Sequence, residues 1–461
     1  MNVNTAKVGN YRWVICSLLF FATTINYMDR QVLSLLKPTL EEEFNWSNSD
    51  YADIAAIFQF VYAVSMLFAG RFVDRIGTKW GYAWSIILWS VGAIIHAYAI
   101  SIGDGINQVF EWIGIAALPV SIIGFMFARG VLAIGEAGNF PSAIKATAEY
   151  FPKSERSFAT GIFNSGANIG AILAPLSVPW IANHWGWATA FEIVGALGFI
   201  WLIFWFIFYE TPAKQKRMGD EERAYISKDQ EEDKRRRKAG LSEEDEKPVS
   251  WLKLLKFRQT WAFTLGKFMT DGVWWFFLFW LPGYLKDQYN IVNEDIMLPL
   301  AVLYSMTMIG SVAGGWFPKY FIARGYAAYD GRMKAMLTIA FFPLLVLLAQ
   351  PLGGVSFWLP VLLIGIGTSA HQAWSANIFT TVSDMFPRRA VASVVGIGGM
   401  AGGVGGALIT KLGGYLFDHY KSLGHIETGY TIMFSICAIA YLAAWSVMKL
   451  LVPKMKVISF D

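Results

Sequence analysis

The chain has 461 residues, of which 55% are hydrophobic and 16% charged, and its mean hydropathy is +0.42. Apolar residues in long blocks and in such excess exclude a soluble globular protein. A net charge of +4 would suggest nucleic-acid binding in a soluble domain. Here the basic residues lie in short segments between apolar runs. We therefore predict that the chain lies in a lipid bilayer and binds no nucleic acid.

Apolar runs of about 20 residues recur along the chain, and each is long enough to cross a hydrocarbon core of about 30 Å as a helix. We predict twelve spans, near residues 13–36, 51–72, 80–102, 117–140, 158–182, 188–209, 259–285, 297–322, 334–351, 356–380, 390–416 and 428–450. Residues 1–10 lack a cleavage site, so we expect the first run to remain as a span. Cys16 and Cys437 both fall inside predicted spans, which leaves no disulfide framework and no cysteine metal site.

The charges between the spans alternate in sign. Arg71, Arg75 and Lys79 follow the second span and a basic run at 234–238 lies in the central segment, whereas the acidic run 41–43 follows the first span. Basic loops of membrane proteins stay on the cytoplasmic side. We therefore predict that both termini are cytoplasmic, with an even number of spans.

One long polar segment, residues 212–257, divides the spans into a half at 1–211 and a half at 258–461. An internal repeat supports this division, because Tyr150-Phe151-Pro152-Lys153 resembles Met385-Phe386-Pro387-Arg388 and glycines follow both at the same offsets. We predict an all-α membrane protein with 12 transmembrane helices in two six-helix halves. Two six-helix halves of this kind are one established plan of membrane transporters, in which the substrate site lies at the interface of the halves, near the bilayer midplane.

The connection between the second and third spans reads Gly70-Arg71-Phe72-Val73-Asp74-Arg75-Ile76-Gly77-Thr78-Lys79. It resembles the signature cytoplasmic loop of the major facilitator superfamily, G-x-x-x-D-R-x-G-x-[RK], and a chance match is on the order of one in a million. Glycines permit a tight turn, and the charged pair can hold a neighbouring helix end. We predict that Gly70, Asp74, Arg75, Gly77 and Lys79 form a gating motif.

Ionisable residues at membrane depth are costly and usually line a water-filled path. Three pairs are predicted there: Asp29 and Arg30 in the first span, Arg129 and Glu136 two turns apart in the fourth, and Lys267 and Asp271 one turn apart in the seventh. Each pair is open to a second interpretation as a structural salt bridge.

Polar and aromatic side chains in other spans complete the candidate substrate site. They are Tyr27, Tyr62, Asn164, His371, Gln372 and Trp374. The histidine is open to a packing role, and no second ligand at metal spacing accompanies it, so we predict no metal site. No serine has a plausible base nearby in sequence, which speaks against an enzyme, and charges confined to a few helix midpoints fit an occluded site better than a channel.

Asn26-Tyr27-Met28-Asp29-Arg30, the span from Arg129 to Glu136, and Phe151-Pro152-x-x-Glu155-Arg156 together resemble the anion:cation symporters, a family within the superfamily. Ala370-His371-Gln372-Ala373-x-Ser375 and the charged pair in the seventh span are most similar to the bacterial hexuronate transporters. The Asp29-Arg30 pair is instead that of galactonate and glucarate carriers, so a symporter for these or another organic anion is the alternative.

The resemblance implies proton symport of a small anionic sugar acid, glucuronate or galacturonate, across the bacterial inner membrane. It implies that Asp29 and Glu136 bind protons, that Arg30 clamps the substrate carboxylate, and that Arg129 tunes Glu136. Which of the two carboxylates is the main proton site is left open. We expect no cofactor besides the coupling proton, and a monomer.

Overall fold

The computed structural model describes residues 9–227, 249–386, 388–456 and 458. The regular structure in the part of the chain that it describes is all helical, with no strand. The basic run at 234–238, which was predicted to lie in a cytoplasmic linker, falls outside the described residues.

The first group of helices ends at Phe208. Its members are α1 (Tyr11–Leu35), α2 (Lys37–Phe44), α3 (Asn48–Ile76), α4 (Thr78–Ile94), η1 (Ile95–Tyr98), α5 (Ala99–Trp112), α6 (Val120–Glu136), α7 (Asn139–Tyr150), α8 (Lys153–Trp185) and α9 (Trp187–Phe208). The segments α4, η1 and α5 follow one another without a gap and form one pass, and α6 continues into α7 after two residues.

The second group begins with the short α11 (Trp251–Leu254). It continues with α12 (Arg258–Tyr289), η2 (Asn293–Ile296), α13 (Met297–Ile322), α14 (Ala328–Phe341), η3 (Phe342–Leu348), α15 (Ala349–Gly353), α16 (Trp358–Met385), α17 (Arg388–Ser422) and α18 (Ile426–Leu451). Again one pass is broken, since α14, η3 and α15 are contiguous. Counting each broken pass once, the described helices supply the twelve predicted passes.

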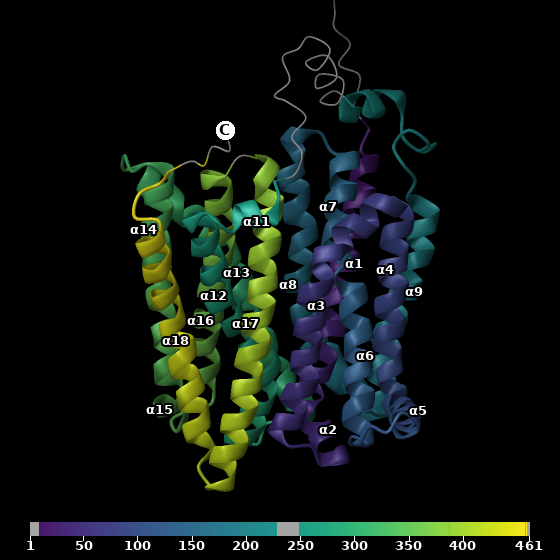
Figure 1. The fold of residues 1–461 in the computed structure, drawn as a ribbon, viewed down its shortest axis with the longest axis vertical. Coiled ribbons are helices and arrows are strands. Elements are labelled where there is room, and N and C mark those ends of the chain that lie inside the picture. Colours follow the sequence, from purple (N-terminus) through teal and green to yellow (C-terminus); the bar gives the residue numbers. More distant parts are fainter. Residues whose placement is uncertain (1–8, 228–248, 387, 457, 459–461) are drawn as a thin grey trace, which may run out of the picture.

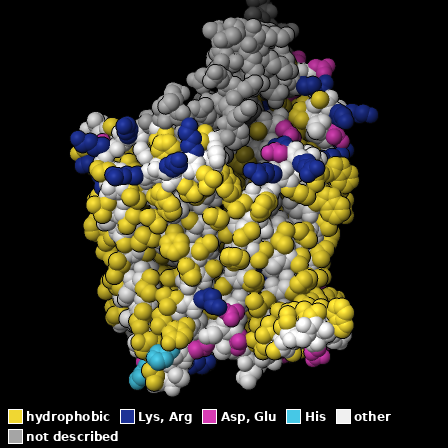
Figure 2. Space-filling model, in the orientation of Figure 1, with side chains coloured by type: hydrophobic (Ala, Val, Ile, Leu, Met, Phe, Trp, Pro, Cys, Tyr) yellow, Lys and Arg dark blue, Asp and Glu magenta, His cyan; other side chains and the backbone are white. Residues whose placement is uncertain are grey.

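Nine of the described helical segments are long and apolar enough to cross a membrane by length and composition. The three other long passes are α1, α12 and α16, which hold Arg30, Lys267 and His371. Figure 2 shows a broad apolar belt across the face in view, with Lys and Arg gathered at one end. That is the end where α1 begins and α18 finishes (Figure 1), and we name it the terminal end.

The two groups lie side by side. Figure 1 shows α1, α3, α4 and α6–α9 on one side and α12–α18 on the other. They meet where α3 packs against α17 and where α8 packs against α13. Helix α17 approaches both of its neighbours at glycines: a Cβ at Gly405 would lie 2.1 Å from the carbonyl oxygen of Phe268 on α12, and one at Gly403 would lie 2.6 Å from the Cβ of Ala63 on α3. Larger residues would prevent this close packing.

Opposite the terminal end, a carboxylate from one group binds the first turn of a helix in the other. Asp418 on α17 accepts hydrogen bonds from the backbone N–H groups of Asn48, at 2.9 Å, and Ser49, at 2.7 Å, and from the Asn48 side chain at 3.1 Å. These N–H groups belong to the start of α3, where the helix dipole also favours a negative charge. We name this the closed end.

A buried lysine strengthens the closed end. The Lys37 ammonium donates to the Asn48 side-chain oxygen at 3.1 Å and lies 5.1 Å from the ring centre of Trp280 on α12. Farther along α3, the Tyr51 hydroxyl donates to the Phe279 carbonyl oxygen at 2.7 Å. These contacts lie in the part of α3 that is nearer the closed end, and they join the two groups of helices there.

Candidate functional site

The central feature of the site is an ion pair between α1 and the last residue of α6. The Arg30 Nη2 and Nε atoms donate to one oxygen of Glu136, Oε2, at 2.6 and 2.9 Å. The two side chains are 4% and 0% exposed. Helix α6 is held in place by a close approach to α4, since a Cβ at Gly135 would lie 2.3 Å from the backbone nitrogen of Trp89.

Aromatic rings surround the Arg30 guanidinium. The ring centres of Tyr27, Tyr62, Trp275 and Phe58 lie 4.8, 4.9, 5.2 and 5.4 Å from its Cζ atom. Arginine over aromatic faces gains cation–π attraction, which is stronger in a desolvated place. Trp275 belongs to α12, so the cage around Arg30 is built from both groups of helices.

Arg129 lies beneath this pair and is fully buried. Its Nη1 and Nη2 atoms donate long hydrogen bonds of 3.5 and 3.4 Å to the carbonyl oxygen of Arg30, and its Cζ lies 4.6 Å from the ring centre of Phe58. The sequence argument linked Arg129 to Glu136 along one helix face. In the structure the direct salt bridge to Glu136 comes from Arg30.

Asp29 is 1% exposed, and neither of its carboxylate oxygens accepts a hydrogen bond from the described residues. A buried charge without a partner costs several kcal/mol. A proton on Asp29 would remove that cost. The geometry therefore suits Asp29 to proton binding as well as it suits Glu136, whose Oε1 is also without a partner among the described residues.

A second polar cluster lies within the other group of helices. The Lys267 ammonium and the Asp271 carboxylate on α12 are 2.6 Å apart. Nearby, His371 on α16 lies with its Nδ1 atom 2.8 Å from the Tyr441 hydroxyl and stacks on Trp274, with ring centres 5.4 Å apart. Trp274 lies on the same helix as Lys267 and Asp271, so His371 packs against the helix that holds the ion pair.

Three other predicted substrate residues lie apart from these contacts. Asn164 is exposed on α8 and Gln372 is half-buried on α16. Trp374 is fully buried and packs edge-on against Tyr441 at 5.5 Å. In this conformation its ring is a packing element, and a substrate would reach it only after a rearrangement.

The predicted gating motif joins α3 to its neighbours at the terminal end. Gly77 ends α3 and precedes α4 with φ of 88°, a conformation that favours glycine. Asp74 Oδ1 lies 2.9 Å from Lys145 Nζ on α7, and the same ammonium donates to the Val73 carbonyl oxygen at 3.1 Å. The end of α3 is thereby attached to α7.

The remaining residues of the motif differ in their surroundings. Lys79 forms a 2.7 Å ion pair with Glu210, just after α9, and this hydrogen bond is the main cause of the lowered pKa of the Glu210 carboxyl. Arg75 is exposed, and the space where a Cβ would stand on Gly70 is open. Within the motif, Asp74 and Lys79 form ion pairs with neighbouring segments. Gly77 adopts a backbone conformation that favours glycine.

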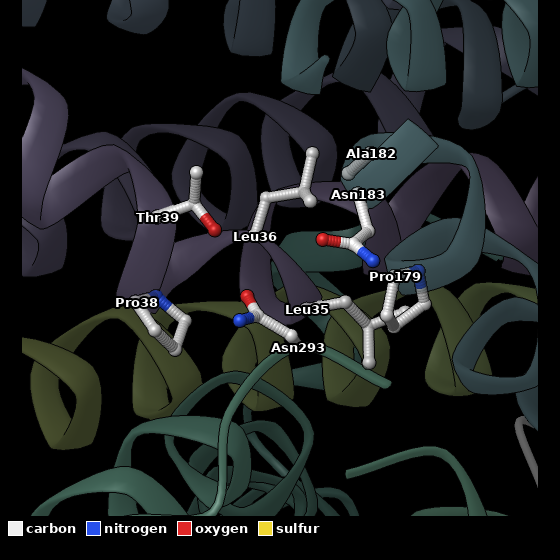
Figure 3. A pocket seen from close by; sticks show the side chains of 8 residues that line it. All are labelled: Leu35, Leu36, Pro38, Thr39, Pro179, Ala182, Asn183 and Asn293. Carbon is white, nitrogen blue, oxygen red and sulfur yellow. The ribbon is translucent and has the colours of Figure 1, made fainter. Parts of the chain in front are cut away.

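A cavity of about 150 Å³ lies at the closed end. Figure 3 shows its lining, which comes from the α1–α2 junction, the end of α8 and a residue just before α13: Leu35, Leu36, Pro38, Thr39, Pro179, Ala182, Asn183 and Asn293. The lining contains no charged side chain. This cavity therefore lacks the cation that an anionic substrate needs, and the ion pairs are the better candidate site.

Sequence reasoning missed several residues that shape the site. Phe58 contacts both buried arginines, and no sequence signal distinguishes it from other apolar residues of its span. Lys37 and Asp418 were not singled out either. The position of Lys37 next to Pro38, at the end of an apolar span, is only a weak sequence signal. The role of Asp418 depends on a contact between segments that are distant in the sequence.

The described architecture agrees with known proteins. Over 451 residues the chain is 31% identical to the hexuronate transporter of Escherichia coli strain K12, covering 96% of this chain and 95% of that protein. It is 32% identical over 315 residues to the galacturonate transporter of Dickeya chrysanthemi, covering 68% and 84%.

Among solved structures, a bacterial homologue of the human lysosomal transporter Spinster, inward-facing and unoccupied, matches with a TM-score of 0.71 at 16% identity. The match covers 96% of this chain and 98% of that one, and it shows the fold alone. The model of the Major Facilitator Superfamily, a family of transporters and not of enzymes, matches residues 19–410. The all-α fold, the apolar belt and these matches together show that the chain is an integral membrane protein that belongs to the major facilitator superfamily.

Proposed function

We propose that the protein is a proton-coupled symporter that carries hexuronates, glucuronate or galacturonate, across the bacterial inner membrane by alternating access. The observation that carries the proposal is the buried Arg30–Glu136 pair at the boundary of the two halves. The names of two relatives, a hexuronate transporter and a galacturonate transporter, supply the substrate class.

Competition for the Arg30 guanidinium links the proton to the substrate. Two of its donors go to Glu136, so a substrate carboxylate must displace that group before Arg30 can bind it through two parallel hydrogen bonds. A proton on Glu136 neutralises the competing charge and releases the arginine. Proton binding and anion binding then favour each other, which is the linkage that symport requires.

The surroundings of Arg30 suit a sugar acid. Tyr27, Tyr62 and Trp275 offer apolar ring faces beside the guanidinium, and such rings pack on the apolar faces of a pyranose while their polar tips reach hydroxyls. A hexuronate has a carboxylate and a sugar ring. Arg30 can bind the carboxylate while the sugar ring packs against these aromatic side chains.

We place the terminal end, rich in Lys and Arg, in the cytoplasm, following the positive-inside rule. The closed end then faces the periplasm, and the contacts of Asp418 and Lys37 keep the substrate site shut on that side. During transport the halves 1–211 and 258–461 rock about the site, with Asp74 as a latch at the cytoplasmic end. We also propose a monomer as the functional unit.

Uptake into vesicles tests substrate and coupling together. Inside-out and right-side-out proteoliposomes are offered labelled glucuronate, galacturonate, galactonate and glucarate, with and without an imposed pH gradient. We expect the two hexuronates to accumulate only when the outside is acidic, and the other acids to compete weakly. Accumulation of galactonate or glucarate in preference to both hexuronates would replace the proposed substrate, and accumulation that ignores the pH gradient would refute proton coupling.

A further inference from the structure

The acidic residue of the second polar cluster has no role in the scheme above. Asp271 lies on α12 one turn after Lys267 and one turn before Trp275, so the three side chains share one stripe of the helix. Trp275 covers Arg30 at 5.2 Å, and Asp271 pairs with Lys267 at 2.6 Å. The stripe therefore connects the Lys267–Asp271 pair to the Arg30–Glu136 pair across the boundary of the halves.

The glycines of α17 hold this stripe in place. A Cβ at Gly402 would lie 2.2 Å from Asp271 Oδ2, and a Cβ at Gly406 would lie 2.5 Å from a ring carbon of Trp275. These two glycines are one turn apart and face two functional side chains that are also one turn apart. Helix α17 thus leaves room for a carboxylate and an indole where any larger residue would displace them.

Helices α1, α16, α17 and α18 pack against α12, and the titratable groups near the Lys267–Asp271 pair come from α12 itself and from three of these neighbours. They are Lys267 on its own helix, Tyr441 on α18 and Tyr27 on α1, with His371 of α16 near the Lys267 ammonium; α17 presents Gly402. The Asp271 side chain is 17% exposed and that of Lys267 is 5% exposed, so the carboxylate is the partner that solvent reaches.

The two pairs have the same chemistry. In each, a buried cation is already bound to a carboxylate of the protein, and an incoming anion has to compete with that carboxylate. We propose that Asp271 is a second proton-binding residue, whose protonation releases Lys267 to bind the substrate. This inference rests on the proposed function, and it gives each half one cation that binds the anion and one carboxylate that controls it.

The proton comes from solvent and the lysine keeps its charge. A protonated Asp271 remains a hydrogen-bond donor and acceptor, so it can stay beside the substrate that has taken its place on Lys267. Transport of one hexuronate would then move one proton more than a mechanism that uses a single carboxylate.

Proton binding is tested first without any substrate. Infrared spectra of the purified protein are recorded as the pH is lowered, and the C=O stretch of protonated carboxylic acids is followed in wild type and in Asp271→Asn. A matched control is Asp384→Asn, because Asp384 also forms a 2.9 Å ion pair, with Arg332, and is 19% exposed. We expect Asp271→Asn to lose one acid-induced component that Asp384→Asn keeps and that Asp271→Glu restores. An acid-induced spectrum of Asp271→Asn identical to that of wild type would overturn the proposal.

Coupling is tested in proteoliposomes by the membrane potential at which net hexuronate flux reverses, which gives the number of protons per substrate. We expect this number to fall by one in Asp271→Asn and to stay unchanged in Asp384→Asn. At alkaline pH, Asp271→Asn should bind hexuronate about tenfold more tightly than wild type, because no carboxylate then competes for Lys267.

The outcomes separate the two ideas. If the wild type transports hexuronate and Asp271→Asn keeps the same proton number, the inference fails while the proposed function stands. If the wild type transports no sugar acid, the proposed function fails, and the infrared titration still decides whether Asp271 binds a proton. Loss of hexuronate binding at every pH in a folded Asp271→Asn protein would show a structural role and would also overturn the inference.

Discussion

The Arg30 guanidinium and the Glu136 carboxylate meet at 2.6 Å although 106 residues separate them in the chain. Both arginine donors go to the same carboxylate oxygen, and the other oxygen has no partner among the described residues. One side of Glu136 is thus held by a cation while the other is able to take a proton. The pair is arranged so that a single proton changes what Arg30 binds.

Arg30→Lys should lose most substrate binding. An ammonium is a point charge and does not reproduce the two parallel hydrogen bonds of a guanidinium, and its cation–π contacts with the surrounding rings are different. We expect the calorimetric Kd for hexuronate to rise at least tenfold, about 1.4 kcal/mol. The control is Arg324→Lys, which changes an exposed arginine and should leave the Kd unaltered. Wild-type affinity in a folded Arg30→Lys protein would remove Arg30 from the site.

Glu136→Gln imitates the protonated state and should separate exchange from accumulation. The variant should still exchange labelled for unlabelled hexuronate across vesicles, because Arg30 is released, but it should not accumulate hexuronate when the outside is acidified. Its substrate affinity should also lose much of its pH dependence, since linkage requires a group whose proton affinity changes on binding. Normal accumulation by this variant would contradict the coupling role of Glu136.

Asp29→Asn is the matched test of the rival proton site. Asp29 is buried without a hydrogen-bonding partner among the described residues, so the amide, which is neutral at all pH values, should be tolerated and should leave the protein at least as stable as wild type. If Asp29→Asn stops proton-driven accumulation while Glu136→Gln does not, the coupling role belongs to Asp29. Melting temperatures of the two variants, measured in detergent, check that both are folded.

Asp74→Asn should slow transport while leaving hexuronate affinity within a few-fold of wild type. Asp74 contacts Lys145 at 2.9 Å, far along α3 from the Arg30 cage, so its loss shifts the balance of conformations without touching substrate. Lys145→Gln should have a similar effect, and the double variant should be no slower than either single one. Complete loss of binding in Asp74→Asn would exclude the role of a latch.

Asp418→Asn should favour opening of the closed end. The carboxylate binds two backbone N–H groups at the start of α3, and removing its charge there weakens the contact by about 1 kcal/mol, or about fivefold in the conformational equilibrium. Spin labels on cysteines introduced at Glu43 and Ser422, both exposed at that end, report the separation of α2 and α17. Native Cys16 and Cys437 are buried.

We expect the distance distribution between these labels to shift toward longer values in Asp418→Asn. Asp104→Asn serves as the control, because it removes an exposed carboxylate of α5 that takes no part in the contact. A distribution equal to that of wild type in both variants would show that Asp418 does not hold the end shut.

Much of the fold follows from the sequence because membrane crossing imposes a simple rule on length and polarity. Each predicted span corresponds to one helical pass, including α1, α12 and α16, whose charged and polar residues reduce their hydropathy, although the spans predicted at 117–140 and 356–380 begin two or three residues before their helices. The helices extend beyond the apolar runs at many ends, as at α3 and α8, because helical hydrogen bonding continues into the interfacial region where the hydropathy signal stops.

The pairing of residues between helices did not follow from the sequence. Helical periodicity places Arg129 and Glu136 on one face of a helix and Lys267 beside Asp271. The Lys267–Asp271 pair could be predicted in this way because both residues lie on one helix. It has no information about the distance from α1 to α6, so the direct Arg30–Glu136 contact was not predicted. The prediction for Trp374 rests on its residue type, and the sequence carries no information that this ring is buried in the structure.

Helix α17 has glycines on two faces, and each face packs against a different helix. An alanine at Gly405 would meet Phe268 of α12 within its own half, so separation of the two halves would not relieve this clash. An alanine at Gly403 would meet Ala63 of α3 in the opposite half, and this clash exists only while the halves touch. If the halves separate at the closed end during the transport cycle, the added methyl group of Gly403→Ala destabilises the state in which they are in contact. It leaves the state in which they are apart unaffected. Gly403→Ala thus provides a way to prepare the protein in its alternative conformation without a ligand or a binding partner.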